Sequence, residues 1–376
     1  MPRTRLALLL IVAALIVGMS AAGCAQSKVP STAKVTLTGR VDRQDGTPAG
    51  GLRLALTRVP DLGEVAFQGI PVAATLGTAC LADDPPPICK LLQRTQTDTT
   101  GTYTVHMNGS DVQGTFNTAT NFDLTAQLPA TASQVDGPSV RAGFQIQRTE
   151  LTVPVLRFWE PDHIAARGDA KNVTLDWAAF RNVNEYTAHF AVRGQEIWSA
   201  ATDPGAAMDA RAFEDADGVV HISTTASAAG PDTTFQLFYT SQGIGFHGTA
   251  GAPESRGKPC VAEGQQSPCA LTDGSFDHPL TEPSCAQTPC AANSWVYVDL
   301  GRSEPVGTVF VRANPGGALT VETSDDAKNW TVRATARDAG RFAGIALPDP
   351  VSARYVRVRG AEGTRLTGLT QLSVWP

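Results

Sequence analysis

The sequence predicts an all-β protein that consists of tandem β-sandwich domains. Glycine and proline are abundant, at 35 and 25 of 376 residues, and only 18% of residues are charged. This composition is more typical of turn-rich β structure than of helices. Short stretches along the whole chain alternate apolar and polar residues, as in Val35–Val41 and Trp295–Leu300, which is the pattern of half-buried strands. The chain is too long for one typical domain, so we expect two or three.

Residues 1–23 are predicted to be a lipoprotein signal peptide. Arg3 and Arg5 precede an unbroken apolar run, Leu6–Val17, and Ala-Ala-Gly precedes Cys24. A charged start, a short apolar core and small residues are typical of a secretory signal, and this run is shorter than the about 20 apolar residues that span a bilayer. The end of the segment resembles a bacterial lipobox, although Ala21 stands where that family usually has Leu. The resemblance implies acylation of Cys24 and a lipid anchor at the membrane, outside the cytoplasm.

The alternative is an ordinary secretory signal in which Cys24 is incidental. Either signal places the rest of the chain outside the cytoplasm. Removing Arg3 and Arg5 makes the net charge of −6 more negative by two. An acidic chain argues against nucleic acid as a partner, because phosphate binding requires a basic surface.

The six cysteines after Cys24 predict disulfides, because an even number in an exported chain is typical of a disulfide framework. None has the C-x2-C spacing of a zinc site. The shortest separations predict the pairs Cys80–Cys89, Cys260–Cys269 and Cys285–Cys290. Six cysteines allow fifteen connectivities, so a crossed or nested pairing of the last four stays open.

The first domain is expected over residues 34–159, after a polar tether at 24–33. Val35–Val41 and Leu52–Leu56 alternate on either side of a turn at Asp45–Pro48, and a second hairpin signal, Thr95–Val105, is interrupted by Thr100-Gly101. These stretches resemble the carboxypeptidase regulatory-like family, a transthyretin-type β-sandwich. The resemblance implies a spacer or docking domain without catalytic residues.

The second domain is expected over residues 160–250. Strand patterns occur at Val173–Trp177, Tyr186–Phe190 and Thr234–Tyr239, and Asp217-Gly218 is a hairpin signal. About seven short strands with a Trp on the second are typical of a sandwich, and the segment resembles a fibronectin type III domain. Trp177 is predicted to be a core aromatic residue.

The third domain is expected over residues 251–376. Its motifs are Ala270–Thr281, Trp295–Gly301, Val321–Trp330, Ala353–Gly360 and the closing LTQLSVW. In this order they resemble a discoidin domain (coagulation factor 5/8 type C), a galactose-binding-like jelly roll that also occurs as a bacterial carbohydrate-binding module. The tryptophans Trp295, Trp330 and Trp375 stand in core-like patterns. The arginines Arg357 and Arg359 alternate with valines, which predicts a solvated or salt-bridged strand face, with a ligand-binding patch as the alternative.

The resemblance implies two sites in the third domain. One is a calcium site in the Leu-Thr-Asp-Gly loop, where Asp273, Asp277 and Thr281 match the family and Gln371 replaces the closing Glu. Calcium requires oxygen ligands, and a loop held by hydrogen bonds alone is the alternative. The other site is a sugar-binding rim, for which the available residues are Phe276, His278, Arg312 and Asn314. Phe276 and His278 are expected to face outward.

The sequence contains no Gly-x-Ser-x-Gly, His-Glu-x-x-His or phosphate-binding glycine loop, so it predicts no enzyme. The preferred hypotheses are a lipoprotein that binds carbohydrate through its third domain and a structural or protein-docking lipoprotein of the envelope. An enzyme with an unrecognised site is a third alternative. The expected partners are the membrane, through Cys24, and either carbohydrate or an envelope protein.

Overall fold

The computed structural model describes residues 26–59, 90–114, 119–180, 183, 185–264, 269–280, 294–312, 317–337, 339–361 and 365–376. Within these ranges the regular structure consists of β-strands and short 3-10 turns, without an α-helix. The prediction of an all-β fold is therefore confirmed. No segment in the described ranges forms a helix with the length and apolar character needed to cross a membrane.

The chain divides into two compact units. Unit 1 comprises residues 1–162, 179–186 and 222–243, and unit 2 comprises residues 163–178, 187–221 and 244–376. Residues 160–250, which we expected to form one domain, are thus shared between both units. The division into three domains, and the family resemblances of the first two, stay predictions.

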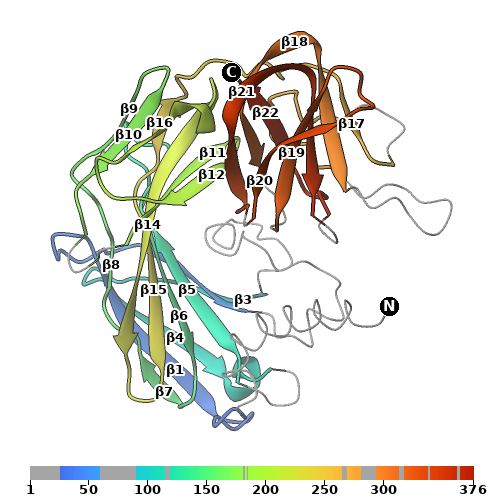
Figure 1. Cartoon of the computed structure of the whole chain (residues 1–376). Helices are drawn as coiled ribbons and strands as arrows, with labels where there is room; N and C mark the ends of the chain where they lie inside the picture. The colour runs from blue at the N-terminus through green and yellow to red at the C-terminus, as the bar shows by residue number, and fades with distance from the viewer. Residues whose placement is uncertain are drawn as a thin grey trace. The chain divides into compact units, whose positions relative to one another are not determined.

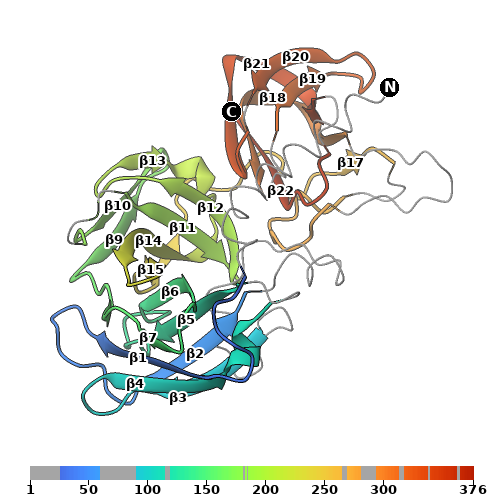
Figure 2. The ribbon, with the colours of Figure 1, turned by 90° about the horizontal axis from the view of Figure 1, so that it is seen from below.

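Unit 1 contains two sheets (Figure 2). One has the strand order β4 (Thr102–Asn108), β1 (Lys34–Asp42), β7 (Glu150–Thr152), with β8 (Leu156–Arg157) also paired to β1. The other has the order β15 (Thr234–Thr240), β6 (Ser139–Gln145), β5 (Asn121–Gln127), β2 (Arg53–Arg58), β3 (Lys90–Gln96). A 3-10 turn, η2 (Gly109–Val112), follows β4.

The two turns predicted as hairpins in unit 1 connect strands of different sheets. The turn at Asp45–Pro48 leads from β1 to β2, but β1 pairs with β4 whereas β2 pairs with β3 and β5. The turn at Thr100-Gly101 separates β3 from β4 in the same way. The hairpin predictions are wrong in their pairing, because turn residues specify a reversal of the chain and the packing of the sandwich decides the partner. Gly101 has a φ of +75°, and a Cβ there would lie 2.5 Å from the carbonyl oxygen of Val41.

The packing of unit 1 begins within the segment predicted as a tether at 24–33. Val29 is 1% exposed, and the Gln113 side chain donates a hydrogen bond of 2.8 Å to its carbonyl oxygen. The described chain is therefore bound to the sandwich five residues before β1.

Unit 2 begins with short antiparallel strands. One sheet has the order β13 (Ala207–Asp209), β10 (Asn172–Trp177), β9 (Ile164–Gly168), and η4 (Ala210–Ala212) follows β13. β11 (Thr187–Val192) pairs with β12 (Gln195–Ala201), and β16 (Ile244–His247) pairs with the start of β14 (Asp217–Ala229). Trp177 is 2% exposed, which confirms its predicted place in a core. Asp217-Gly218 does not form a hairpin turn, because both residues pair with β16.

The C-terminal part of unit 2, orange to dark red in Figure 1, is a sandwich built on two long strands. Its strands are β17 (Cys260–Ala262), β18 (Trp295–Arg312), β19 (Leu319–Ser324), β20 (Thr331–Ala336), β21 (Phe342–Gly360) and β22 (Gln371–Trp375). They follow the order β17-β18-β21-β19-β20, and β22 also pairs with β18.

Register shifts in the β18–β21 pairing lie between Asp299 and Glu304 and between Val306 and Thr308. At irregularities of this kind strands bend, so each long strand contributes to both layers. We call the layer with residues 295–299, 355–359, β17, β19 and β20 the front sheet. The layer with residues 308–312, 342–346 and β22 is the back sheet.

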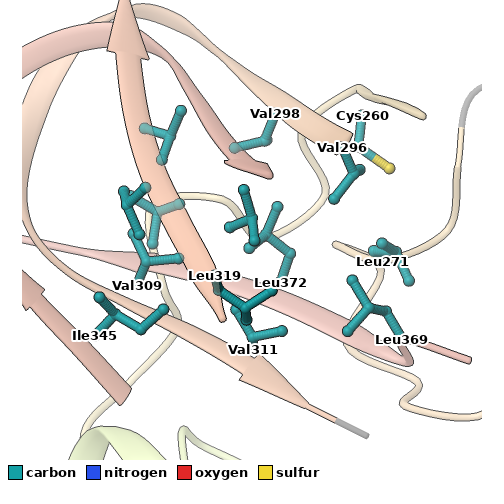
Figure 3. Packing of buried hydrophobic residues seen from close by; sticks show 14 of the residues in the cluster. Cys260, Leu271, Val296, Val298, Val309, Val311, Leu319, Ile345, Leu369 and Leu372 are labelled. Atoms are coloured by element: carbon teal, nitrogen blue, oxygen red, sulfur yellow. The ribbon is translucent and has the colours of Figure 1, made fainter. Parts of the chain in front are cut away.

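The inward side chains of both sheets form one apolar core (Figure 3). Val296 and Val298 of the front sheet and Val309 and Val311 of the back sheet are all fully buried in it. Figure 3 shows Leu271 and Leu369, from loops beside the sheets, reaching the same core. This packing holds the loop Leu271–Leu280 on a rigid scaffold.

Candidate functional site

The loop Leu271–Leu280, which we call the 271–280 loop, is fixed at both ends. Leu271 and Leu280 are 0% and 3% exposed. The amide of Leu372 donates a hydrogen bond of 2.8 Å to the carbonyl oxygen of Leu271, and the amide of Leu280 donates one of 2.7 Å to that of Leu369. Both ends therefore lie beside β22, and the polar residues Asp273, Asp277 and His278 between them are exposed.

Two carboxylates and an imidazole meet in this segment. His278 Nδ1 lies 2.7 Å from Asp273 Oδ2, and His278 Nε2 lies 3.7 Å from Asp277 Oδ1. The hydrogen bond to Asp273, together with the charge of Asp277, raises the pKa of His278. Partial burial opposes ionisation of Asp273, but hydrogen bonds from Ser275 and His278 lower its pKa overall. The cluster is therefore a hydrogen-bonded group, with the His278 side chain 60% exposed.

The carboxylates of this loop are engaged by neighbouring side chains, which does not favour the predicted calcium site. His278 lies between the two carboxylates that calcium would use, and the Ser275 amide and hydroxyl both donate to Asp273 Oδ1 over 2.8 Å. Gln371 is fully buried, and neither its amide oxygen nor its amide nitrogen has a hydrogen-bond partner among the described residues, so its role as a ligand stays a prediction. Those residues include no group of three or more His, Cys, Asp or Glu that could hold a metal ion. Thr281, the remaining predicted ligand, lies outside the described ranges.

Phe276 does not face outward, and this prediction is wrong. Its side chain is 1% exposed, and its ring lies 5.6 Å from Arg312 Cζ. Its φ is +62°, a conformation that is uncommon for a bulky residue. The free energy gained by burying the large ring offsets the cost of this backbone conformation, so Phe276 anchors the loop.

Arg312 is also absent from the surface, contrary to its predicted place on a sugar-binding rim. Its side chain is 1% exposed, and its Nη2 lies 3.1 Å from Oε1 of Glu214, which is fully buried. Its Nη1 donates a hydrogen bond of 3.0 Å to the carbonyl oxygen of Ile197. Burial lowers the pKa of Arg312, against the attraction of Glu214. The sequence carries no signal for this partner, which lies 98 residues away.

The other side chains on the outer surface of the back sheet are covered in the same way. Ser373 donates a hydrogen bond to Oε1 of Glu214, and Arg211 donates one of 3.0 Å to Thr308. Trp375, predicted as a core residue, is 5% exposed. Residues 197–214 thus cover this sheet, whereas aromatic side chains on the outer face of the front sheet are partly exposed among the described residues.

Cys260 and Cys269 form a disulfide, with Cα atoms 5.2 Å apart, which confirms the predicted pair. The other predicted pairs, Cys80–Cys89 and Cys285–Cys290, lie outside the described residues, as do Asn314 and the predicted lipid acceptor Cys24. These assignments stay predictions.

The outer face of the front sheet carries four aromatic side chains, of which the sequence predicted Trp295 and Trp330 to be core residues. Trp295, Tyr297, Trp330 and Tyr355 are each partly exposed. The core placement of Trp295 and Trp330 is therefore wrong. Trp295 belongs to the outward half of the β18 alternation, whose valines fill the core, and Trp330 lies before β20 with its ring over Arg357. The predicted salt-bridged arginine face is confirmed, since Arg357 forms an ion pair with Glu322 on this surface.

Residues 270–358 match the family model described as the F5/8 type C, NedA-like galactose-binding domain. A comparison with curated protein sequences found no match.

Among solved structures, chitosan-binding module 1 of a chitosanase/glucanase from Paenibacillus sp. IK-5 is similar at 22% identity, over 33% of this chain and 98% of that one, with a TM-score of 0.26. Module 2 of the same enzyme, in complex with chitotriose, is similar at 18% identity over 33% and 99%, with a TM-score of 0.27. SpGH29 is similar at 21% identity over 33% of this chain, with a TM-score of 0.26, and the match spans only 27% of its length.

The family match falls on the segment whose motifs carried the sequence resemblance. It includes the 271–280 loop, Trp295 and Trp330 of the front sheet, and β21 up to Val358. The C-terminal part of the chain therefore carries an F5/8 type C, galactose-binding-like domain over residues 270–358.

Proposed function

We propose that this chain is a lipid-anchored, extracytoplasmic bacterial protein that binds carbohydrate, without catalysis, through its C-terminal domain. The match of residues 270–358 to a galactose-binding domain is the observation that carries this proposal. The signal-like segment before Cys24 supports the location, and the acidic composition is compatible with a neutral ligand such as a sugar.

The geometry of unit 2 is also favourable for sugar binding. A pyranose ring offers an apolar C–H face and a rim of hydroxyl groups, so its recognition needs aromatic rings beside charged or polar side chains. The front sheet supplies partly exposed rings next to arginine–carboxylate pairs, including Arg354 with Asp299 at 2.9 Å. These groups lie on strands of a rigid sandwich, which keeps a binding surface in place.

A glycan array tests the proposal directly. The probe is the soluble chain Gln26–Pro376, because the back sheet of the C-terminal domain is covered by residues 197–214 and the domain alone would expose Arg312 and Trp375. We expect binding to galactose-containing glycans. An array without any bound glycan would contradict the proposed function.

A second candidate is a structural or protein-docking lipoprotein of the envelope. It is favoured by the burial of Phe276 and Arg312, which removes two of the four side chains expected on the sugar-binding rim. This candidate predicts an empty array, so the same experiment separates the two functions.

The anchor is tested by replacing the predicted acceptor, Cys24→Ser. We expect the variant to be released from membranes or to remain unprocessed, because stable anchoring depends on the acyl chains. Membrane fractionation at the wild-type level, with the wild-type apparent mass, would show that Cys24 carries no lipid.

A further inference from the structure

We propose that the carbohydrate site of this protein is the outer face of the front sheet, centred on Trp330, and that its ligand is an oligosaccharide. This inference rests on the proposed function and adds the location of the site and the size of the ligand. The 271–280 loop, where the sequence placed the sugar contacts, serves to close the core.

Trp330 lies flat against the sheet. The Arg357 Cζ atom is 4.1 Å from the centre of its ring, and Arg357 is itself held by an ion pair with Glu322. The side chains of Arg357 and Glu322 are 15% and 6% exposed, so they lie beneath the indole. Because one ring face covers this guanidinium and Trp330 remains partly exposed, the opposite ring face points away from the sheet. That face is free to stack on a sugar ring.

Further rings extend this surface. The Tyr297 ring centre lies 5.6 Å from that of Trp330 and 5.9 Å from that of Tyr355. Trp295 stacks on Tyr297 at 5.8 Å, with 14° between the ring planes. The four rings come from β18, β21 and the turn before β20, and they are continuous across the face.

Charged groups surround the rings. Arg359, the cross-strand partner of Trp295, is 57% exposed. Arg354 is 43% exposed and pairs with Asp299, which is 23% exposed. Guanidinium and carboxylate groups donate and accept hydrogen bonds in fixed directions, as recognition of sugar hydroxyls requires. A purely apolar protein-docking face would lack this rim.

The dimensions favour an oligosaccharide. From β18 to β20 the face spans three inter-strand steps, or about 14 Å, which exceeds the width of one pyranose ring. Val332 on β20, opposite Glu322 and 59% exposed, continues the apolar surface beyond β19. We therefore expect tighter binding of galactotetraose than of galactose. The affinity should be modest, because a flat face immobilises a ligand without enclosing it.

The 271–280 loop lacks the corresponding features. Its aromatic ring, Phe276, is buried, and the neighbouring Arg312 is committed to Glu214. Of the predicted sugar-contact residues that the structure describes, His278 is the one whose side chain is exposed. This makes His278→Ala the matched control for a variant of the front-sheet face.

The first test needs no substitution. The soluble chain Gln26–Pro376 is treated with N-bromosuccinimide, which oxidises accessible tryptophans, with and without galactotetraose, and the tryptophan peptides are quantified by mass spectrometry. We expect Trp330 and Trp295 to be oxidised in the free protein and protected by the sugar. Trp159 and Trp375, at 0% and 5% exposed, are internal controls that should react slowly in both states. Undiminished oxidation of Trp330 at a saturating sugar concentration would overturn the proposal.

The second test compares variants by titration with galactotetraose. Trp330→Ala should weaken binding about tenfold or more, because it removes the ring that stacks on the sugar, and Trp330→Phe should restore part of the binding. His278→Ala should bind as wild type does. The reverse pattern would overturn the location of the site while leaving the proposed function intact. Failure of the wild-type protein to bind any glycan would overturn both.

Discussion

Arg312 on β18 and Glu214, which follows η4, form an ion pair of 3.1 Å with side chains 1% and 0% exposed. Glu214 also accepts hydrogen bonds from Arg256 and Ser373. The Glu214 carboxylate thus binds three side chains of the C-terminal domain, those of Arg312, Arg256 and Ser373. Within unit 2, this network joins residues 197–214 to the back sheet.

Breaking this pair should be costly. We expect Arg312→Met to lower the free energy of unfolding by about 3–5 kcal/mol, because it leaves a buried carboxylate short of its partner. Chemical denaturation measures the change. Arg302→Met is the control in the same strand: Arg302 pairs with Glu304 but is 82% exposed, so its loss should change the free energy of unfolding very little. Similar costs for both variants would show that the Arg312 pair is not a stabilising contact.

Phe276→Ala should also destabilise the protein, by about 3–5 kcal/mol, the usual cost of removing a buried ring. Phe276 is 1% exposed with a φ of +62°. A glycine adopts this φ without strain, so Phe276→Gly should be no less stable than Phe276→Ala. At ordinary backbone angles glycine is the more destabilising of the two. Denaturation curves of both variants test this, and a wild-type curve for Phe276→Ala would refute the role of the ring as an anchor.

Calcium should have no effect on the stability of the protein. The His278 ring lies between Asp273 and Asp277 and is hydrogen-bonded to Asp273, so a cation would have to displace the imidazole to bind there. Thermal melts of the soluble chain in millimolar calcium and in chelator should therefore coincide. A higher melting temperature in calcium would mean that the metal binds the native state and that the family's calcium site is retained.

Asp326 should make the turn between β19 and β20 sensitive to acid. Its carboxylate accepts hydrogen bonds from the amides of Asn329 and Lys328, over 2.8 and 2.9 Å, and these bonds lower its pKa. A lowered folded-state pKa stabilises the fold above the unfolded value of about 3.9, and this contribution is lost as the pH falls through the folded value.

The variant Asp326→Ala should therefore melt at a lower temperature than wild type at pH 7, and the difference should shrink below pH 4. Lys328→Ala, which keeps the backbone donor, should leave the pH dependence unchanged. A difference that is constant from pH 7 to pH 2.5 would rule out this role for Asp326.

The sequence predicted strands well where alternation was strong. The predicted strand at Val35–Val41 lies within β1, and those at Trp295–Leu300 and Ala353–Gly360 lie within β18 and β21. It did not predict that the turns at Asp45–Pro48 and Thr100-Gly101 join different sheets, because strand pairing depends on the packing of the whole sandwich.

The candidate site was harder to predict, for two physical reasons. Alternation shows that Tyr297 and Val298 point to opposite faces, but it does not show which aromatic residues stay uncovered. Trp330 lies in a turn, where alternation gives no direction at all, and its contacts with Arg357 and Tyr297 show how its ring is oriented. The burial of Arg312 depends on Glu214, far away in the chain, and no local pattern encodes such a contact.

Binding of galactose-containing carbohydrate by the intact protein is the central claim, and retention on agarose, a galactose-containing polymer, tests it most directly. The soluble chain Gln26–Pro376 should be retarded on an agarose column, should elute with free galactotetraose, and should lose its retention on Trp330→Ala substitution while the fold is preserved. Elution in the void volume, with an empty glycan array, would contradict carbohydrate binding and leave the docking role.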